Sequence, residues 1–265
     1  MMTDRRRMLM TAQGGAEPEI YINGYVGGGL VHYWDGKDNR GIGEAHASSG
    51  FPWVDLAGTR DIVSTDRQEQ ATWVTTDFTA DSLYINTQRT YRQCFTFEDI
   101  LDTSNGEVSI EVRFSAGNAG EASPFGLSHG NTTPTMAFYQ DRGAGTVGIV
   151  FNSAATYKQF RYITAPAEDT EYHTLTMTYK IGEATLRLYV NGILAGNYTP
   201  QPSVADFSAR MTSGTLRTVI GSSNAQVANG IYLNPGYVSR ICVYNRILSP
   251  EQVLSNYNND IARFT

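Results

Sequence analysis

The chain has 265 residues and a formal net charge of −6, with 41% hydrophobic and 17% charged residues. This balance excludes a nucleic-acid-binding protein that follows phosphates with a basic face, and no run approaches the roughly 20 apolar residues of a membrane span. Its 26 glycines, 16 tyrosines and 11 phenylalanines are typical of short strands joined by turns. We therefore expect one all-β sandwich with a single core.

Residues 1–27 are expected to form an N-terminal arm ahead of the folded domain. Only three apolar residues follow the basic cluster Arg5-Arg6-Arg7, whereas the apolar core of a secretory signal spans about 7–15 residues. The arm is either a disordered tail or a segment that becomes ordered on a partner subunit, because it lacks sustained periodicity. We expect the sandwich to occupy residues 28–265.

The first expected strand, residues 30–34, leads into a long loop with a candidate metal site. Asp35, Asp38 and Asn39 supply the oxygen donors that Ca²⁺ prefers. The stretch DGKDNRG lacks the complete register of a calcium-binding loop. Ordinary turn-forming Asp and Asn residues are therefore the alternative.

Further strands are expected through the middle of the chain, where apolar and polar residues alternate between turns rich in Gly, Ser and Asn. They are residues 60–64, 72–79, 82–86, 92–97, 107–114, 135–139, 146–151, 159–163, 217–221 and 237–245. Nothing in the sequence has the spacing of a P-loop, a dinucleotide fingerprint or a zinc site. Cys94 and Cys242 are expected to be buried free thiols, and a disulfide would require an oxidising compartment.

Residues 172–198 contain the strongest strand signal. The residues expected to face the core are His173, Leu175, Met177 and Tyr179, and those expected on the wetter face are Thr174, Thr176 and Thr178. Asn191-Gly192 can adopt positive φ at both central turn positions, which predicts a tight antiparallel hairpin.

A short helix is expected near the end of the chain. Ser249 is its N-cap, Pro250 its first residue and Gln252 the partner that completes a capping box. Val253, Leu254 and Tyr257 then form a narrow apolar stripe. We expect this helix to pack across the end of the sandwich.

Three segments of the chain resemble the laminin-G-like, concanavalin A-like lectin/glucanase superfamily. They are GGGLVHYWDGKDN, YHTLTMTYKIGEATLRLYVNG and VSRICVYNRILSPEQVLSNYNND. They occur in the family's order and together frame residues 28–260. The resemblance implies an antiparallel two-sheet jelly-roll sandwich with a short C-terminal helix. It does not assign a function, because this fold carries lectins, adhesion modules, virion components and some glycanases.

The resemblance also directs attention to two possible sites. Glycans would be recognised by loop aromatic rings and amide groups, and the candidate ligand-binding residues are Trp34, Trp53, Asn39, Asn224, Asn229, Tyr232 and Asn234. Both tryptophans have a core position as their alternative. Related modules hold Ca²⁺ at the sandwich rim, but Ser239 stands here where the family usually has an aspartate.

Glucanases of the same superfamily carry catalytic carboxylates in an E-x-D-x-E arrangement on one strand. Glu107 and Glu111 match its outer positions, and Ser109 replaces the central Asp. Retaining hydrolysis needs two carboxyl groups about 5–5.5 Å apart, whereas Cα atoms four positions apart on a strand are separated by about 13 Å. We therefore expect no catalytic site, with a glycan hydrolase using Glu107 and Glu111 as the alternative.

The expected function is a non-catalytic surface or structural module of a bacteriophage particle (a head decoration, fibre or tail component) that binds host or environmental glycans. Residues 1–27 would contact other virion subunits, and we expect a homo-oligomer without nucleic-acid or membrane partners. Virion proteins leave the host by lysis and need no secretory signal. A bacterial surface adhesin module is a further alternative.

Overall fold

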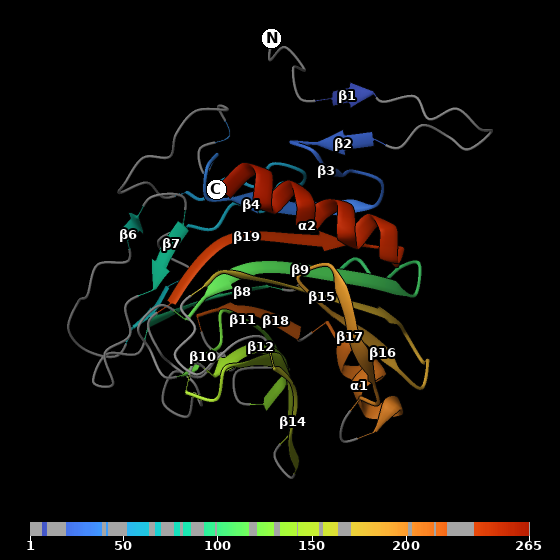
Figure 1. The fold of residues 1–265 in the computed structure, drawn as a ribbon. Coiled ribbons are helices and arrows are strands. Elements are labelled where there is room, and N and C mark those ends of the chain that lie inside the picture. Colours follow the sequence, from blue (N-terminus) through green and yellow to red (C-terminus); the bar gives the residue numbers. More distant parts are fainter. Residues whose placement is uncertain are drawn as a thin grey trace.

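The computed structural model describes residues 7–9, 20–38, 41, 52–63, 67–69, 77–79, 82–85, 93–98, 100–116, 121–129, 133–141, 143–153, 156–163, 171–200, 203–214, 216–221 and 236–264. Two large antiparallel sheets pack face to face, with one helix on an outer face (Figure 1). The expected all-β jelly-roll sandwich with a short C-terminal helix is confirmed.

The helix-side sheet contains eight strands. They are β4 (Leu30–Asp35), β6 (Asp77–Thr79), β7 (Ser82–Ile85), β9 (Glu107–Ser115), β15 (His173–Lys180), β16 (Leu186–Val190), β17 (Ile193–Tyr198) and β19 (Gly236–Tyr244). Their order is β17-β16-β15-β9-β19-β7-β6, and β4 also pairs with β19. The sheet therefore centres on β9 and β19.

The opposite sheet also contains eight strands. They are β5 (Arg67–Glu69), β8 (Gln93–Glu98), β10 (Glu121–Ala122), β11 (Phe125–His129), β12 (Thr133–Asp141), β13 (Thr146–Ser153), β14 (Thr156–Ile163) and β18 (Leu216–Ile220). Their order is β14-β13-β12-β11-β18-β8-β5, and β10 pairs with β12. Strand β8 includes the backbone of Cys94, whose side chain lies outside the described residues.

The main core fills the space between the two sheets. Strand β9 shows how the sequence produces it, because Val108, Ile110, Val112 and Phe114 alternate along the strand and all belong to the core cluster. On β15, the predicted inward residues Leu175, Met177 and Tyr179 join the same cluster. The helix-side sheet therefore contributes one complete apolar face.

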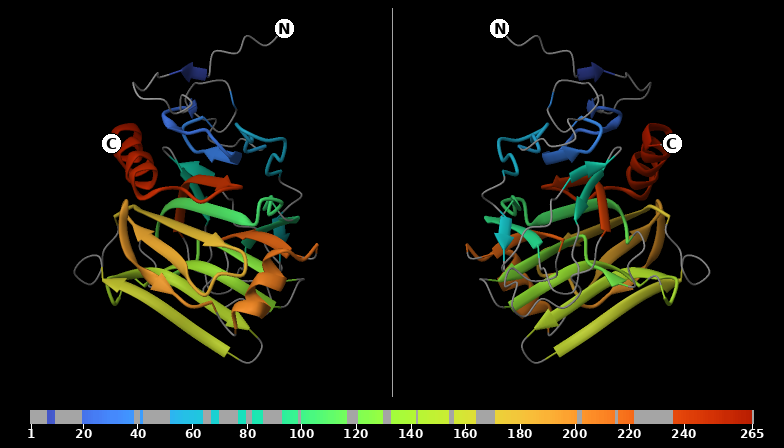
Figure 2. Two further views of the ribbon diagram at one scale, coloured as in Figure 1. Left: turned by 90° about the vertical axis from the view of Figure 1, so that its right-hand side faces the viewer. Right: turned by 90° about the vertical axis from the view of Figure 1, so that its left-hand side faces the viewer.

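The outer face of the helix-side sheet is also buried, which the alternation did not predict. Thr174, Thr176 and Thr178 were expected on a wetter face, but all three are buried. Helix α2 (Pro250–Phe264) lies against this side of the sheet (Figure 2). Thr174 donates to Asp260 of α2 at 2.6 Å, so the helix replaces solvent as the partner of this polar face.

Helix α2 begins as the sequence predicts. The Gln252 amide donates to Ser249 Oγ at 3.3 Å, and the Ser249 amide donates to Gln252 Oε1 at 3.0 Å, which completes the capping box. Its buried residues are Val253, Asn256 and Asp260. Helix α2 packs against the outer face of the helix-side sheet, so the expectation that it packs across the sandwich end is wrong. Polar as well as apolar residues of α2 face the sheet.

A small three-stranded sheet packs beside α2 on the same side of the sandwich (Figure 2). It consists of β1 (Arg7–Leu9), β2 (Ile20–Ile22) and β3 (Tyr25–Val26). Tyr25 and Val26 are buried in a second cluster with Tyr33, Tyr189, Cys242, Tyr244, Leu248 and Val253. The predicted boundary between residues 27 and 28 is therefore wrong, because Tyr25 and Val26 are part of the folded core.

Two Asn-Gly turns close tight hairpins. Asn191 and Gly192 have φ of 51° and 79°, which confirms the predicted turn between β16 and β17. Asn23 and Gly24 have φ of 51° and 86° between β2 and β3, although the sequence analysis assigned them to the arm. An added Cβ on Gly24 would lie 2.4 Å from Asn259 Oδ1, so the turn needs glycine for its close contact with α2 as well.

Helix α1 (Val204–Met211) lies in a stretch between the expected strands, where no element was expected. Its N-cap is Ser203, whose Oγ accepts from the Asp206 amide at 3.1 Å. Phe207 and Met211 face the main core. In the described part of the chain, neither helix has the length and hydrophobicity needed to cross a membrane.

Candidate functional site

The two tryptophans predicted to stack on sugars are core residues. Trp34 and Trp53 have 0% exposure and belong to the main core cluster. Trp34 Nε1 donates to the Arg60 carbonyl at 3.0 Å, and Trp53 Nε1 donates to the Asp35 carbonyl at 2.9 Å. Neither ring presents a face to solvent, so the stacking role does not hold in this structure. The core position that the sequence left open is the observed one.

Asp35 and Asp38, from the predicted calcium site, are buried. Asp35 Oδ1 accepts from the amides of Lys37 at 2.7 Å and Asp38 at 3.3 Å, and Oδ2 accepts from the Tyr33 hydroxyl and from Arg263 Nε at 2.8 Å. The Arg263 guanidinium stands where a cation would have to bind. These two residues therefore do not fit a calcium site, and no group of three or more metal-ligating side chains is found among the described residues.

The other predicted ligand-binding residues lie outside the described residues. They are Asn39, Asn224, Asn229, Tyr232 and Asn234. Their role in glycan binding stays a prediction.

Asp55 bonds the turn at residues 55–60 to β4, a role that was not expected from the sequence. Its carboxylate accepts from the amides of Tyr33, Ala57, Gly58 and Arg60 at 2.9–3.2 Å and lies 2.6 Å from His32 Nδ1. Burial opposes ionisation of this carboxyl, but the bonds from His32 and the backbone outweigh it and lower its pKa. The turn at residues 55–60 is therefore held to β4 by an anionic side chain within the protein.

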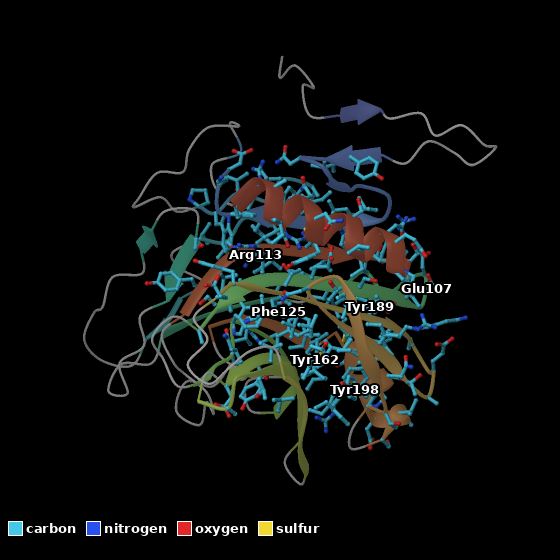
Figure 3. The ribbon with its side chains drawn as sticks, viewed as in Figure 1. Glu107, Arg113, Phe125, Tyr162, Tyr189 and Tyr198 are labelled. Carbon is cyan, nitrogen blue, oxygen red and sulfur yellow. The ribbon has the colours of Figure 1, made fainter. Side chains whose placement is uncertain are left out.

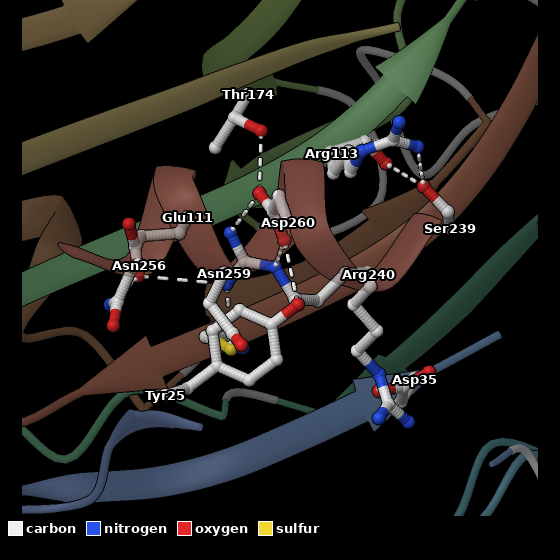
Figure 4. Close-up of polar contacts among 12 residues, drawn as sticks. Tyr25, Asp35, Glu111, Arg113, Thr174, Ser239, Arg240, Asn256, Asn259 and Asp260 are labelled. Carbon is white, nitrogen blue, oxygen red and sulfur yellow. Dashed lines mark hydrogen bonds and ion pairs between the residues drawn. The ribbon is translucent and has the colours of Figure 1, made fainter. Parts of the chain in front are cut away.

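Glu111, half of the carboxyl pair considered as the catalytic alternative, lies beneath α2 in a buried polar network (Figure 4). Its carboxylate accepts from Thr176 Oγ1 at 2.9 Å and from Asn256 Nδ2 at 2.5 Å, and it lies 3.6 Å from Arg240 Nη1. Glu111 has 0% exposure. A polysaccharide chain has no route to this carboxyl while α2 is in place.

Asp260 is the principal partner of Arg240 in this network. Arg240 Nη2 donates to Asp260 Oδ2 at 2.8 Å, and Arg240 Nε lies 2.7 Å from Oδ1. Tyr25 donates its hydroxyl to Asp260 Oδ1 at 2.7 Å, and the Arg240 guanidinium lies over the Tyr25 ring at 4.5 Å. The network thus joins the N-terminal hairpin, the sheet and α2.

Both Arg240 and Glu111 have a raised pKa in this network. Burial alone would lower the pKa of Arg240, but Asp260, with Cys242 and Glu111, raises it well above the ordinary value. Burial raises the pKa of Glu111, and the attraction of Arg240 does not cancel this effect because Asp260 adds like-charge repulsion. A raised carboxyl pKa is common in catalytic acids, yet here it follows from sequestration.

Glu107 has different surroundings from Glu111. It is half-buried at the start of β9, where its Oε2 accepts from the Ile247 amide at 3.3 Å. Figure 3 shows Glu107 and Arg113 towards opposite ends of the strand. Because Glu111 is enclosed, the two carboxyls do not form an accessible acid–base pair.

Arg113 is a second buried cation, which the sequence analysis did not single out. It is 7% exposed at the far end of β9, and its Nη1 donates to Ser239 Oγ at 2.9 Å. Its guanidinium carbon lies 4.3 Å from the centre of the Tyr172 ring and 4.7 Å from that of Phe264. Tyr172 also contacts Tyr237, with ring centres 6.4 Å apart. This aromatic cluster combines a guanidinium with partly exposed rings.

Comparison with known proteins places most of the chain in one family. The family model described as the concanavalin A-like lectin/glucanases superfamily, of laminin G type, matches residues 89–254. No curated protein sequence matches the chain. The matched segment includes β9, β15 and β19, whereas β2, β3 and most of α2 lie outside it.

Solved structures share the fold at low sequence identity. The botulinum neurotoxin serotype D binding domain has a TM-score of 0.55 at 12% identity, and covers 89% of this chain and 53% of its own. The receptor binding domain of the botulinum neurotoxin C/D mosaic serotype has a TM-score of 0.54 at 12% identity, with 89% and 52% covered. A mutant NanB sialidase from Streptococcus pneumoniae has a TM-score of 0.49 at 16% identity, with 66% and 27% covered. The chain thus spans about half of the toxin domains and about a quarter of the sialidase.

Proposed function

The chain belongs to the concanavalin A-like lectin/glucanase superfamily, and we propose that it is a non-catalytic carbohydrate-recognition module on the surface of a bacteriophage particle. Recognition is one of the roles that this lectin-like fold carries, although the fold alone does not select among them. Two of the structures that share the fold are binding domains of toxins by their descriptions, one of them a receptor binding domain.

The observation that carries the non-catalytic part is the position of Glu111. Two accessible carboxyl groups about 5–5.5 Å apart are needed for retaining glycoside hydrolysis. Glu111 is enclosed by Thr176, Asn256 and Arg240, and Glu107 is bound to the backbone of the segment before α2. Hydrolysis at this pair would require α2 to leave the sheet.

A glycan array, run with and without EDTA, tests recognition by the intact protein. We expect binding to a defined glycan subset that EDTA does not change, because Asp35 is already paired with Arg263. A blank array would contradict the proposed recognition. A parallel β-glucan panel should release no reducing sugar, and activity that is lost in Glu111→Gln would refute the non-catalytic assignment.

The proposed virion setting predicts that the N-terminal arm docks onto the particle. The structure changes how this is tested, because a deletion of residues 1–27 would remove the buried Tyr25 and Val26. A deletion of residues 1–19 spares both β2 and β3. We expect the shortened protein to keep its melting temperature and to be absent from purified particles. Unchanged incorporation would contradict the docking role.

Self-association is part of the proposal, with a second copy of the chain as the partner. Strand β17 ends the helix-side sheet, and its sequence ILAGNY carries no charge. Ile193 and Leu194 are 64% and 47% exposed, and Leu254 of α2 lies beside the preceding turn at Gly192. Two such uncharged strands can pair about a twofold axis without like-charge repulsion. Light scattering should show a dimer that Leu194→Glu dissociates, whereas Tyr162→Glu on β14 leaves the mass unchanged.

A further inference from the structure

Arg113 differs from the other buried arginine of the helix-side sheet in lacking a carboxylate partner. Arg240 is paired with Asp260 and Glu111. Among the described residues, no Asp or Glu oxygen lies within 4 Å of the Arg113 guanidinium, and its side-chain contacts are Ser239 and the rings of Tyr172 and Phe264. Asp260 attracts Arg113 electrostatically but makes its direct contacts with Tyr25, Thr174 and Arg240.

The remaining N–H groups of Arg113 reach solvent. No side-chain nitrogen of Arg113 is both fully enclosed and without a hydrogen bond. Arg113 Nε and Nη2 are therefore not enclosed, although the residue is only 7% exposed. Figure 4 shows the guanidinium bonded to Ser239 and separate from Asp260. The Nε–H and Nη2–H groups of Arg113 are therefore available to donate hydrogen bonds to a ligand.

The surroundings of Arg113 favour a planar anion. Aromatic rings that lie over a guanidinium cover its faces and leave the N–H groups in its plane. Those groups match the two oxygens of a carboxylate in a bidentate arrangement. Lys37 Nζ lies 5.8 Å from the centre of the Phe264 ring and adds positive charge to this end of a protein whose net charge is −6.

We propose that Arg113, with the partly exposed rings of Tyr172 and Tyr237, forms a binding site for a saccharide that carries a carboxylate, such as a uronic acid. The guanidinium binds the carboxylate, and a tyrosine ring packs against the sugar. This inference rests on the proposed carbohydrate recognition for its saccharide part. It adds the chemical class of the ligand and the residues that select it.

Nuclear magnetic resonance on the intact protein tests this site with glucuronate and glucose as probes at constant ionic strength. The Arg113 side-chain Nε–H signal is assigned by its loss in Arg113→Lys. We expect glucuronate to shift this signal and to bind at least tenfold more tightly than glucose. Acetate should shift it more weakly, because acetate has no sugar ring to pack on tyrosine.

Variants separate the site from general effects on folding. Arg113→Lys keeps the charge but loses the bidentate geometry, and we expect it to weaken glucuronate binding about tenfold. Tyr172→Leu should weaken glucuronate more than acetate, which also tests the site if Arg113→Lys fails to fold. Arg187→Gln removes an exposed arginine on β16 and should change neither. Equal binding of glucuronate and glucose, or glucuronate binding unaffected by both site variants, would overturn the inference.

The outcomes also separate this inference from the proposed function. An array with only neutral glycans bound would support recognition while refuting the acidic site. A blank array together with glucuronate binding at Arg113 would refute the module's role as a glycan receptor and retain the anion site. Equal shifts by glucuronate and acetate would show a carboxylate site without saccharide selectivity, contrary to the proposal.

Discussion

Replacing Asp260 with alanine should be among the most damaging single changes in this protein. Asp260 accepts from Tyr25, Thr174 and Arg240 with distances of 2.6–2.8 Å. Removing one partner of a buried ion pair costs about 3–5 kcal/mol, because the remaining charge is left uncompensated. Glu111 is the only other carboxyl near Arg240 among the described residues, at 3.6 Å, and its raised pKa limits the compensation it offers. We expect a loss of about 4 kcal/mol.

The assay is urea unfolding at pH 7 followed by tryptophan fluorescence, with a thermal melt alongside. For a protein of this size the expected loss corresponds to a fall of about 8–16 °C in melting temperature. Glu183→Ala is the matched control, since Glu183 is half-exposed and its pair with Lys180 spans 3.8 Å. That variant should change the free energy of unfolding by less than about 0.5 kcal/mol. A change below about 1 kcal/mol in Asp260→Ala would refute the reasoning.

A combined variant distinguishes the loss of charge compensation from the loss of packing. Glu111→Leu, Arg240→Met and Asp260→Leu together remove all three charges of the network at once. Apolar replacement of a whole buried ionic group is often neutral or stabilising. We therefore expect the triple variant to be more stable than Asp260→Ala, and the opposite order would show that the polar contacts are needed for packing.

Three further predictions concern the same region. Gly24→Ala should destabilise the protein more than Gly182→Ala in urea unfolding. Both glycines have φ near 87°, but only Gly24 has a neighbour, Asn259, within 3 Å of an added Cβ. Equal losses of stability in the two variants would exclude a contribution from that contact. Burial raises the folded pKa of Glu111, so its contribution to stability is present below the unfolded pKa of about 4.3 and is lost as the pH rises through the folded pKa. The free energy of unfolding of the wild type, relative to that of Glu111→Gln, should therefore fall over that pH range. A difference that does not change with pH would contradict this prediction. Burial raises the pKa of the Cys242 thiol to about 12. Iodoacetamide at pH 8 should therefore leave Cys242 unmodified until the protein unfolds, which peptide mapping would detect. Rapid labelling of the native protein would contradict the burial of this thiol.

The fold could be predicted because period-two alternation and turn chemistry are local signals. Strand β9 and the Asn191-Gly192 turn carry both without help from distant residues. The buried free thiol of Cys242 was also predicted and is confirmed. The Asn23-Gly24 turn has the same signal, so the N-terminal hairpin could have been recognised from it. Its assignment to an arm overlooked turn chemistry that was present in the sequence.

The burial of the outer face could not be predicted from alternation. Thr174 and Thr176 are polar because their partners are Asp260 and Glu111, yet a polar strand face normally indicates contact with water. Only the packing of α2, which begins more than 70 residues later, shows that these hydroxyls are enclosed. The inward face of α2 was expected to be a narrow apolar stripe, but it also includes the polar residues Asn256 and Asp260. Their partners on the sheet could not be identified from the sequence.

The candidate site shows the same dependence on distant segments. Trp34 and Trp53 stand beside a polar loop in sequence, but their indole groups donate to backbone carbonyls inside the core. Arg113 lies on an alternating strand, where an arginine ordinarily points into solvent. Tyr172 and Phe264, which define its surroundings, are separated from it by 59 and 151 positions in the chain. Composition and residue spacing do not predict contacts between residues so far apart in the chain.

The contact between Tyr25 and Asp260 also constrains the order of events during synthesis. The two residues are 235 positions apart, so at 5–20 residues per second a ribosome needs roughly 12–47 s to add the second after the first. Until then Arg240 has no principal partner, and the tyrosines of the second cluster lack their cover. The sandwich strands are all made before α2 emerges. Closure by α2 thus comes after synthesis of every described strand of the sandwich, and a chain truncated before Asp260 would present the open face to chaperones.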